Sequence, residues 1–184
     1  MKTLKTSYQF TAFLALLVLV SCTSTKFSSV WKDETYQGRP VKIMVVSTYK
    51  DPGSRRLFED ELVKAMKEHR VDAAASYAVL PDQSVSDKNA ITLQAKALGA
   101  DTVLINKPGG ARKEEVTGPW STEYNLAMSD VYITTQTEVY DMKSGRLIMT
   151  ASAETWVREG ISNAVLLQSY IRDLVRKLSQ QGLI

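Results

Sequence analysis

Residues Val131 to Trp156 read VYITTQTEVY-DMKSG-RLIMTASAETW, and this stretch predicts the element from which the fold can be built. In the first ten residues, β-branched side chains alternate with polar or aromatic ones, which is typical of a strand with one face in water. The segment DMKSG predicts a turn, and the returning segment places on one face Leu147, Met149, Ala151 and Ala153. The stretch therefore predicts an antiparallel β-hairpin.

The chain before the hairpin predicts a strand followed by a helix. The β-branched run Val41–Val46 is expected to be a strand buried on both faces. Asp51 is a good N-cap and Pro52 suits the first helical position, so a helix is expected to begin there. Its predicted apolar stripe comprises Phe58, Leu62, Met66 and His69.

A second unit of the same kind follows. We expect a strand over Val71–Leu80 and then a helix capped by Ser84 or Ser86. The inward face of this helix comprises Ile91, Ala95 and Leu98, and Gly99 supplies the left-handed position that ends it. A third strand is predicted at Thr102–Ile105, and the Gly-, Pro- and charge-rich stretch 107–125 is predicted to be a long loop.

The carboxyl-terminal segment predicts a long amphipathic helix, with an apolar stripe of Ala164, Leu167, Ile171, Leu174 and Leu178. The elements then follow in the order β-α-β-α-β-β-β-α. We interpret the chain as an α/β protein, a single-domain sandwich of two or three layers around a mixed sheet of about five strands. The helices are expected to cover one or both faces of that sheet.

The amino terminus has the parts of an export signal. Lys2 and Lys5 precede the apolar run Phe10–Val20, which is too short to cross a bilayer as a stable helix. Residues 19–22, Leu-Val-Ser-Cys, resemble a bacterial lipobox, which implies cleavage before Cys22 and a diacylglycerol on its sulfur. An ordinary signal peptide with an incidental cysteine is the alternative. We therefore divide the chain into a signal peptide (1–21), a lipidated tether (22–29) and a periplasmic domain (30–184).

Composition restricts the function of the mature chain. Removing 21 residues from 184 leaves 163, enough for one ordinary domain. Two of the 23 basic residues are lost with the signal, so 21 basic and 20 acidic residues give a formal charge of +1. That balance favours no nucleic-acid partner. Cys22 is the single cysteine, so an internal disulfide is excluded.

No catalytic set is recognisable. A hydrolase would have to use His69, the single histidine, with a nearby acid such as Asp72, and no Gly-x-Ser-x-Gly motif supplies a nucleophile. The stretch 107–113 lacks the ending of a phosphate-binding loop. The acidic run 59–61 is interpreted as a solvated helix face. We predict no catalytic, cofactor-binding or metal-binding residue, and hence no enzyme.

Aromatic residues in the second half are the strongest candidates for a binding surface. Tyr132 and Tyr140 share one face of their strand, and Trp156 lies on the returning strand. They can form core beneath the terminal helix, line a partner or glycan surface, or be scattered over the surface. With the loop residues Gly109 and Gly110 they make up the candidate partner surface.

Three segments carry a resemblance to uncharacterised bacterial lipoproteins of about this length: RRLFED (55–60), GADTVL (99–104) and VYDMKSGRL (139–147). That family brings no known activity. In topology the chain is also similar to periplasmic α/β domains, namely the amino-terminal domain of the Tol propeller protein, the lipoprotein activators of penicillin-binding proteins and the curli secretion lipoprotein. These resemblances imply an anchor or adaptor, although shared topology does not transfer function.

The sequence therefore predicts an envelope lipoprotein held in a membrane through Cys22 and acting as a non-enzymatic binding or adaptor module for an envelope protein. Thr23 stands after the cysteine where an aspartate would favour the inner membrane, so the outer membrane, facing the periplasm, is expected. The alternatives are a component of an oligomeric secretion or envelope-stress assembly, and an unrecognised envelope hydrolase. The oligomeric state and the partner's identity stay open.

Overall fold

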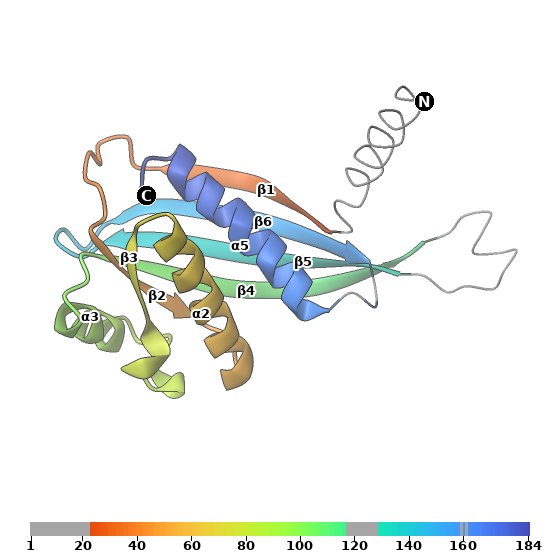
Figure 1. Ribbon diagram of the computed structural model, residues 1–184, viewed down its shortest axis with the longest axis horizontal. Helices are drawn as coiled ribbons and strands as arrows, with labels where there is room; N and C mark the ends of the chain where they lie inside the picture. Colours follow the sequence, from red (N-terminus) through yellow and green to blue (C-terminus); the bar gives the residue numbers. More distant parts are fainter. Residues whose placement is uncertain (1–22, 117–128, 159, 161) are drawn as a thin grey trace, which may run out of the picture.

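Six strands form a mixed sheet in the order β1-β6-β5-β4-β2-β3, with helices on both of its faces (Figure 1). The structure is a computed structural model that describes residues 23–116, 129–158, 160 and 162–184. The strands are β1 (Thr23–Lys32), β2 (Lys42–Ser47), β3 (Asp72–Ala75), β4 (Thr102–Glu115), β5 (Ser129–Asp141) and β6 (Leu147–Arg158). The helices are α2 (Pro52–Glu68), α3 (Lys88–Ala97) and α5 (Asn163–Gln180). The predicted α/β class is confirmed.

The predicted hairpin is confirmed as β5 and β6, which pair antiparallel. Asp141 Oδ2 accepts hydrogen bonds from the backbone N–H of Ser144 at 2.8 Å and from its hydroxyl at 2.5 Å. Gly145 has a φ of +70°, a conformation that costs glycine little. Local turn chemistry therefore agrees with the alternation of the two strands.

Helix α2 begins as predicted, because the Asp51 carboxylate accepts from the backbone N–H of Ser54 at 2.7 Å and Pro52 opens the first turn. Phe58, Leu62 and Met66 are buried, whereas His69, the expected fourth member of the stripe, is exposed at the helix C-cap. The helix has already ended there, so His69 no longer follows the buried face.

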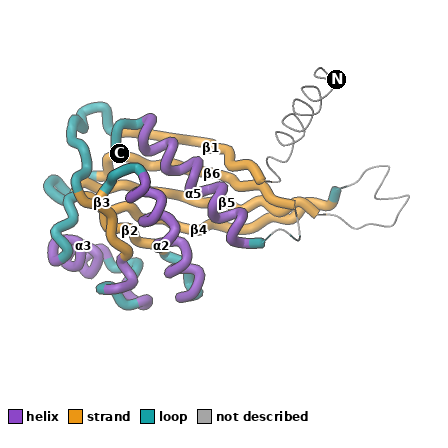
Figure 2. Tube along the Cα trace, in the orientation of Figure 1, coloured by secondary structure: helices purple, strands orange, loops and turns teal. Residues whose placement is uncertain are grey.

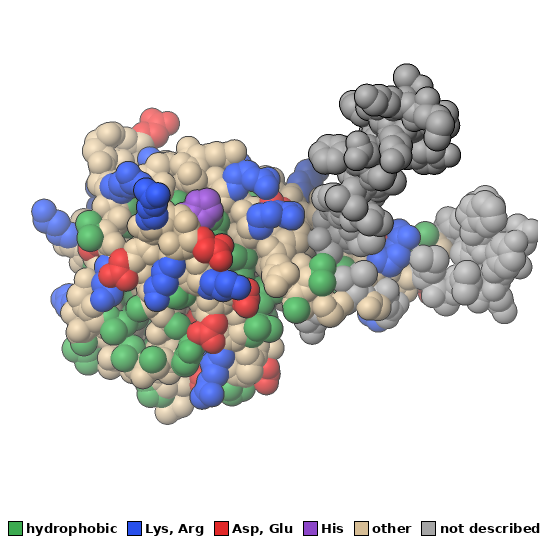
Figure 3. Space-filling view, viewed as in Figure 1, with side chains coloured by type: hydrophobic (Ala, Val, Ile, Leu, Met, Phe, Trp, Pro, Cys, Tyr) green, Lys and Arg blue, Asp and Glu red, His purple; other side chains and the backbone are tan. Residues whose placement is uncertain are grey.

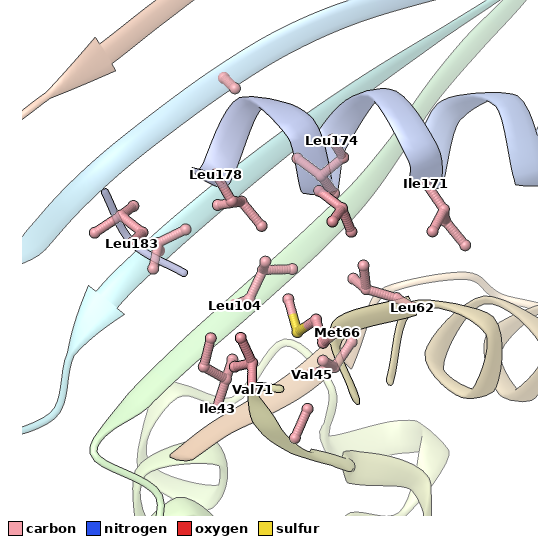
Figure 4. Packing of buried hydrophobic residues seen from close by; sticks show 14 of the residues in the cluster. Ile43, Val45, Leu62, Met66, Val71, Leu104, Ile171, Leu174, Leu178 and Leu183 are labelled. Atoms are coloured by element: carbon pink, nitrogen blue, oxygen red, sulfur yellow. The ribbon is translucent and has the colours of Figure 1, made fainter. Parts of the chain in front are cut away.

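Two apolar clusters lie on opposite faces of the sheet. The larger one fills the space between the sheet and helices α2 and α5, where Leu174 and Leu178 lie close to Leu104 and Met66 (Figure 4). The α5 stripe is buried as predicted, except for Ala164, which is exposed. The smaller cluster joins α3 to β2 and β4, and includes Met44, Val46, Ile91, Ala95 and Val103. The sandwich therefore has three layers only over β2 and β4.

Two expected boundaries in the first half are wrong. The second strand ends at Ala75, because the chain turns into short 3-10 helices at Ser76–Ala78 and Asp82–Ser84. The α3 N-cap is Asp87, which accepts from Asn89 N at 2.8 Å, and neither Ser84 nor Ser86 has this position. Gly99 ends α3 with a φ of +66°, as predicted.

Two stretches that we expected to lack regular structure are strands. Residues 23–29, interpreted as a tether, belong to β1, which pairs with β6 and gives the sheet its sixth strand. Thr25 and Thr155 hydroxyls are 3.1 Å apart, so short polar side chains pair well here. Strand β4 extends to Glu115, and Pro108, which lacks an N–H, stands at a bulge. The rest of the predicted loop, 117–125, lies outside the described residues.

The acidic run 59–61 is not wholly solvated, because Glu59 is fully buried. Its Oε1 accepts from Arg55 Nε at 3.0 Å, Ser76 Oγ at 2.9 Å and Ser47 N at 2.9 Å. Its Oε2 accepts from Tyr77 N at 2.9 Å. Arg55 is itself 1% exposed and also binds Ser76 Oγ, at 2.8 Å. The expectation failed because Arg55 lies one turn earlier in the same helix, while the other partners of this carboxylate come from two distant segments, the end of β2 and the turn after β3.

Replacing Arg55 with Met should destabilise the chain by about 3–5 kcal/mol, since a buried Glu59 carboxylate would lose its countercharge. Urea denaturation followed by circular dichroism measures this loss. Arg56→Met is the matched control, because Arg56 is exposed and its guanidinium only stacks 5.6 Å from the Tyr77 ring centroid. That control should lose at most about 1 kcal/mol. Equal effects of the two substitutions would contradict a structural role for the buried pair.

Candidate functional site

Half of one sheet face has no helix above it among the described residues. Alternate residues of β5 and β6 point into the α5 core, including Thr137, Val139, Met149 and Ala151. The residues between them point to the other side, where α3 covers only β2 and β4. We name this side of β1, β6 and β5 the open face. On the opposite, helical face, side chains of both charge signs are interspersed (Figure 3).

Aromatic and arginine side chains form a row across the distal end of the open face. Strand register places Tyr132 beside Trp156 and beside Arg112. The Arg112 guanidinium lies 4.2 Å from the Tyr132 ring centroid, and that of Arg158 lies 5.8 Å from the Trp156 ring. Arg112 also donates to Glu154 at 3.2 Å. We name Arg112, Tyr132, Trp156 and Arg158 the distal row; the strand ends that carry it extend beyond α2 and α5 (Figure 2).

The middle of the open face is polar and slightly hollow. A depression of about 490 Å³ lies over the β4 bulge and neighbouring strands, and its lining includes Lys26, Gly109, Gln136, Ser152 and Glu154. The Thr134 hydroxyl donates to Gly110 O at 3.1 Å. A Cβ added to Gly109 would lie 2.2 Å from Thr134 Oγ1, so this position has room only for glycine. Glycine here permits the close approach of β4 and β5.

A larger groove of about 710 Å³ lies between α3 and the proximal end of the open face. Its floor is apolar and is formed by Ile91, Val103, Ile105, Tyr140 and Met142. Its polar lining includes four lysines and a single carboxylate: Lys88, Lys96, Lys107, Lys143 and Glu138. These five residues give the lining a formal charge of +3 at neutral pH.

Glu138 is the centre of a hydrogen-bond network at one end of the groove. Its carboxylate lies 2.7 Å from Lys107 Nζ and accepts from Tyr140 Oη at 2.8 Å and Gln136 Nε2 at 3.2 Å. Burial alone would raise the pKa of Glu138, but the contacts with Lys107 and Tyr140 lower it overall. Burial, with help from Glu138, raises the pKa of Tyr140 to about 12. Glu138 is therefore ionised and Tyr140 neutral at physiological pH.

A second polar cluster is buried beneath α5. Tyr170 Oη lies 2.6 Å from Thr137 Oγ1 and accepts from Asn106 Nδ2 at 3.2 Å. Burial raises the pKa of Tyr170, so its phenol stays protonated. These contacts join α5 to β4 and β5 and have no opening to the groove. We assign the cluster to the packing of the helix.

The five residues of the predicted partner surface do not form one patch. All three aromatic residues point away from α5, so of the three alternatives the one that makes them core beneath that helix is excluded. Tyr132 and Trp156 belong to the distal row, whereas Tyr140 lies in the groove, roughly 27 Å along the strand at about 3.4 Å per residue. Gly109 and Gly110 lie between them. The groove lysines could not be identified from the sequence, because they share no motif and only the fold brings them together.

The other candidate residues are placed as follows. His69 lies at the end of α2 beside a small hollow that α5 also lines, and Asp72 has Lys42 Nζ 3.8 Å away. No hydrogen bond joins His69 to Asp72 in the described structure. Cys22 and the signal segment lie outside the described residues. Within those residues, no helix has the length and apolar character needed to cross a membrane, and no three metal-ligating acidic, histidine or cysteine side chains gather.

No protein-family model and no curated protein sequence matches this chain. Among solved structures, a PelC point variant from Paraburkholderia phytofirmans, described as a dodecamer, is similar with a TM-score of 0.53 and 14% identity. That match covers 88% of this chain and 99% of the PelC chain. A second PelC dodecamer from the same organism gives 0.52 at 13% identity, covering 85% and 96%. Lipoprotein GNA1162 from Neisseria meningitidis gives 0.49 at 14% identity, covering 77% and 99%.

At these identities the PelC comparisons show a shared fold. The match spans almost the whole PelC chain and most of this one. The described fold is therefore one that bacterial PelC chains also have.

Gly109→Ala should destabilise the sheet by about 1–3 kcal/mol, because the added methyl group must displace Thr134. Gly110→Ala is the matched control, since its Cβ would meet nothing within 4 Å. The control should stay within about 0.5 kcal/mol of the parent chain. Chemical denaturation of the two variants measures both values, and an unaltered Gly109 variant would show that β4 and β5 do not approach so closely.

Proposed function

We propose that the chain is a lipid-anchored bacterial envelope protein that binds an envelope protein partner through its open face and catalyses no reaction. Cys22 carries the lipid, and the domain faces the periplasm from the outer membrane. The observation that carries this proposal is the open face itself, a sheet surface that no helix covers among the described residues. The opposite side of the same strands packs against α5, except at their distal ends.

The composition of the open face supports a binding role. Trp31 is 48% exposed on the edge strand β1, beside the polar depression that Ser152 and Glu154 line. Exposed tryptophan and arginine are enriched where proteins bind each other, and a polar rim gives such a surface its specificity. The face therefore combines one aromatic anchor with hydrogen-bonding groups.

The start of β1 supports the position of the anchor. Thr23 pairs with Val157 and Ser24 with Trp156, so β1 begins beside the distal row, and a lipid on the preceding residue would be attached at this end of the sheet. Tyrosine, tryptophan and arginine suit the boundary between lipid and water. The distal row then faces the membrane, and Trp31 and the groove lie at the end away from it.

Cys22→Ser should abolish membrane attachment and leave either an uncleaved precursor or a soluble species. A lipoprotein cysteine carries several acyl chains, each contributing about 0.8 kcal/mol per buried methylene, whereas serine carries none. Membrane fractionation with immunodetection checks this outcome. A serine variant that stayed tightly bound would overturn the lipobox assignment.

A photoreactive amino acid at Ser152 should capture one protein of fixed mass in intact envelopes, and the same group at exposed Lys64 on α2 should not. Mass spectrometry identifies the captured protein. Trp31→Ala should reduce its capture by about tenfold or more, because aromatic anchors dominate such interfaces. Capture that is equal at both positions, or insensitive to Trp31, would contradict a specific partner on the open face.

The dodecameric state of the PelC structures favours a second candidate, in which the partner is another copy of this chain within an oligomeric assembly. In that case the captured species would have twice the mass of the chain. Sedimentation of the full chain separates the two candidates, because a monomer at the concentrations used for capture contradicts the assembly.

A further inference from the structure

We propose that the groove beside α3 binds a single-chain fatty carboxylate. This site lies at the proximal end of the open face, between that face and α3, and its ligand does not depend on the proposed protein partner. The groove volume of about 710 Å³ falls within the range of about 300–1,000 Å³ that is typical of small-molecule sites. An apolar floor with a basic rim suits a ligand that has a hydrocarbon chain and a negatively charged end.

The apolar floor suits a hydrocarbon chain. Ile91 on α3 faces Val103 and Ile105 on β4, and Tyr140 and Met142 continue the floor along β5 and its turn. The α3 wall, from Lys88 to Lys96, is about 12 Å long at 1.5 Å per residue. A hydrocarbon chain laid along this wall would remove apolar surface of both the ligand and the floor from water.

The lysines differ between the two ends of the groove. Near the start of α3, Glu138 neutralises Lys107 and lowers the local positive potential. Near the end of α3, Lys96 and the hairpin-turn residue Lys143 line the groove without a carboxylate in the lining. Neither has a salt bridge within 4 Å in the described structure; Lys143 acts on Asp141 only at longer range, where it helps to lower the pKa of that carboxyl. A ligand carboxylate is therefore favoured at the Lys96–Lys143 end.

An extended peptide fits the groove less well. The floor strands β4 and β5 are hydrogen-bonded to each other and to their other neighbours, so no free strand edge is available there to pair with a peptide backbone. Burying unpaired peptide N–H and C=O groups is costly. A fatty chain has no such groups, and its single charged end meets the two lysines. The shape and charge of the groove therefore favour an amphiphile over a peptide.

Photolabelling of the full chain in a neutral maltoside detergent tests this site. The probe is a myristic acid that carries a diazirine in its chain, and peptide mass spectrometry locates the label. We expect labelling within residues 88–105 and 138–145, competed by unlabelled myristate. Lys96→Gln combined with Lys143→Gln should weaken apparent binding about tenfold, and Thr92→Trp, which fills the groove from its rim, should remove the label.

Two controls keep the result decisive. Lys50→Gln combined with Lys67→Gln changes the same charge at exposed positions outside the groove and should leave labelling unchanged. A diazirine alcohol of equal chain length should label at least tenfold less than the acid. Equal labelling by the alcohol, label spread over other segments, or no effect of the groove lysines would each overturn the proposal. Thermal midpoints show that the variants are folded. Loss of partner capture with normal fatty-acid labelling would contradict the proposed function of the open face and leave the groove proposal intact.

Discussion

The carboxylate of Glu59 is withdrawn from water at the point where β2 ends, and the surrounding chain is organised to satisfy it. Both oxygens accept hydrogen bonds, from the backbone of Ser47 and Tyr77 and from the side chains of Ser76 and Arg55. A buried charge without partners costs several kcal/mol. This requirement fixes α2 against the ends of β2 and β3, and it explains why the chain leaves β3 as a 3-10 turn.

The same network reaches across the sheet to the groove. Arg55 also donates to Asp82 at 2.6 Å, in the 3-10 helix that leads to α3. Val85 and Ser86 follow this contact and line the groove, and Asp87 then caps the helix that forms its wall. A buried ion pair on the helical face thus positions an element of the opposite face. The position of α3, and with it the width of the groove, depends on contacts that lie outside the groove.

Local patterns were sufficient to predict the hairpin, α2, α5 and the class of the fold, because each is encoded by side-chain periodicity and capping. Strand β1 and the distal half of β4 were missed because Ser, Gly, Pro, Lys and Glu have weak strand preference alone. These stretches become strands through pairing with partners elsewhere in the sequence. Strand β1 pairs with β6, and the distal half of β4 pairs with the first half of β5. Glu59 was misplaced for the same reason, since its partners other than Arg55 are distant in the sequence.

The candidate site shows a similar limit. Alternation correctly placed Tyr132 and Tyr140 on one face of their strand, but it did not show which face α5 would cover. The apolar positions Val139, Met149 and Ala151 decide that choice, and the aromatic residues are left on the open face. Lys107 lines both the groove and the polar depression, and it holds Glu138 between them. A charge bound in either hollow acts on this shared ion pair, so the two hollows, which lie on one face of the sheet, are electrostatically coupled.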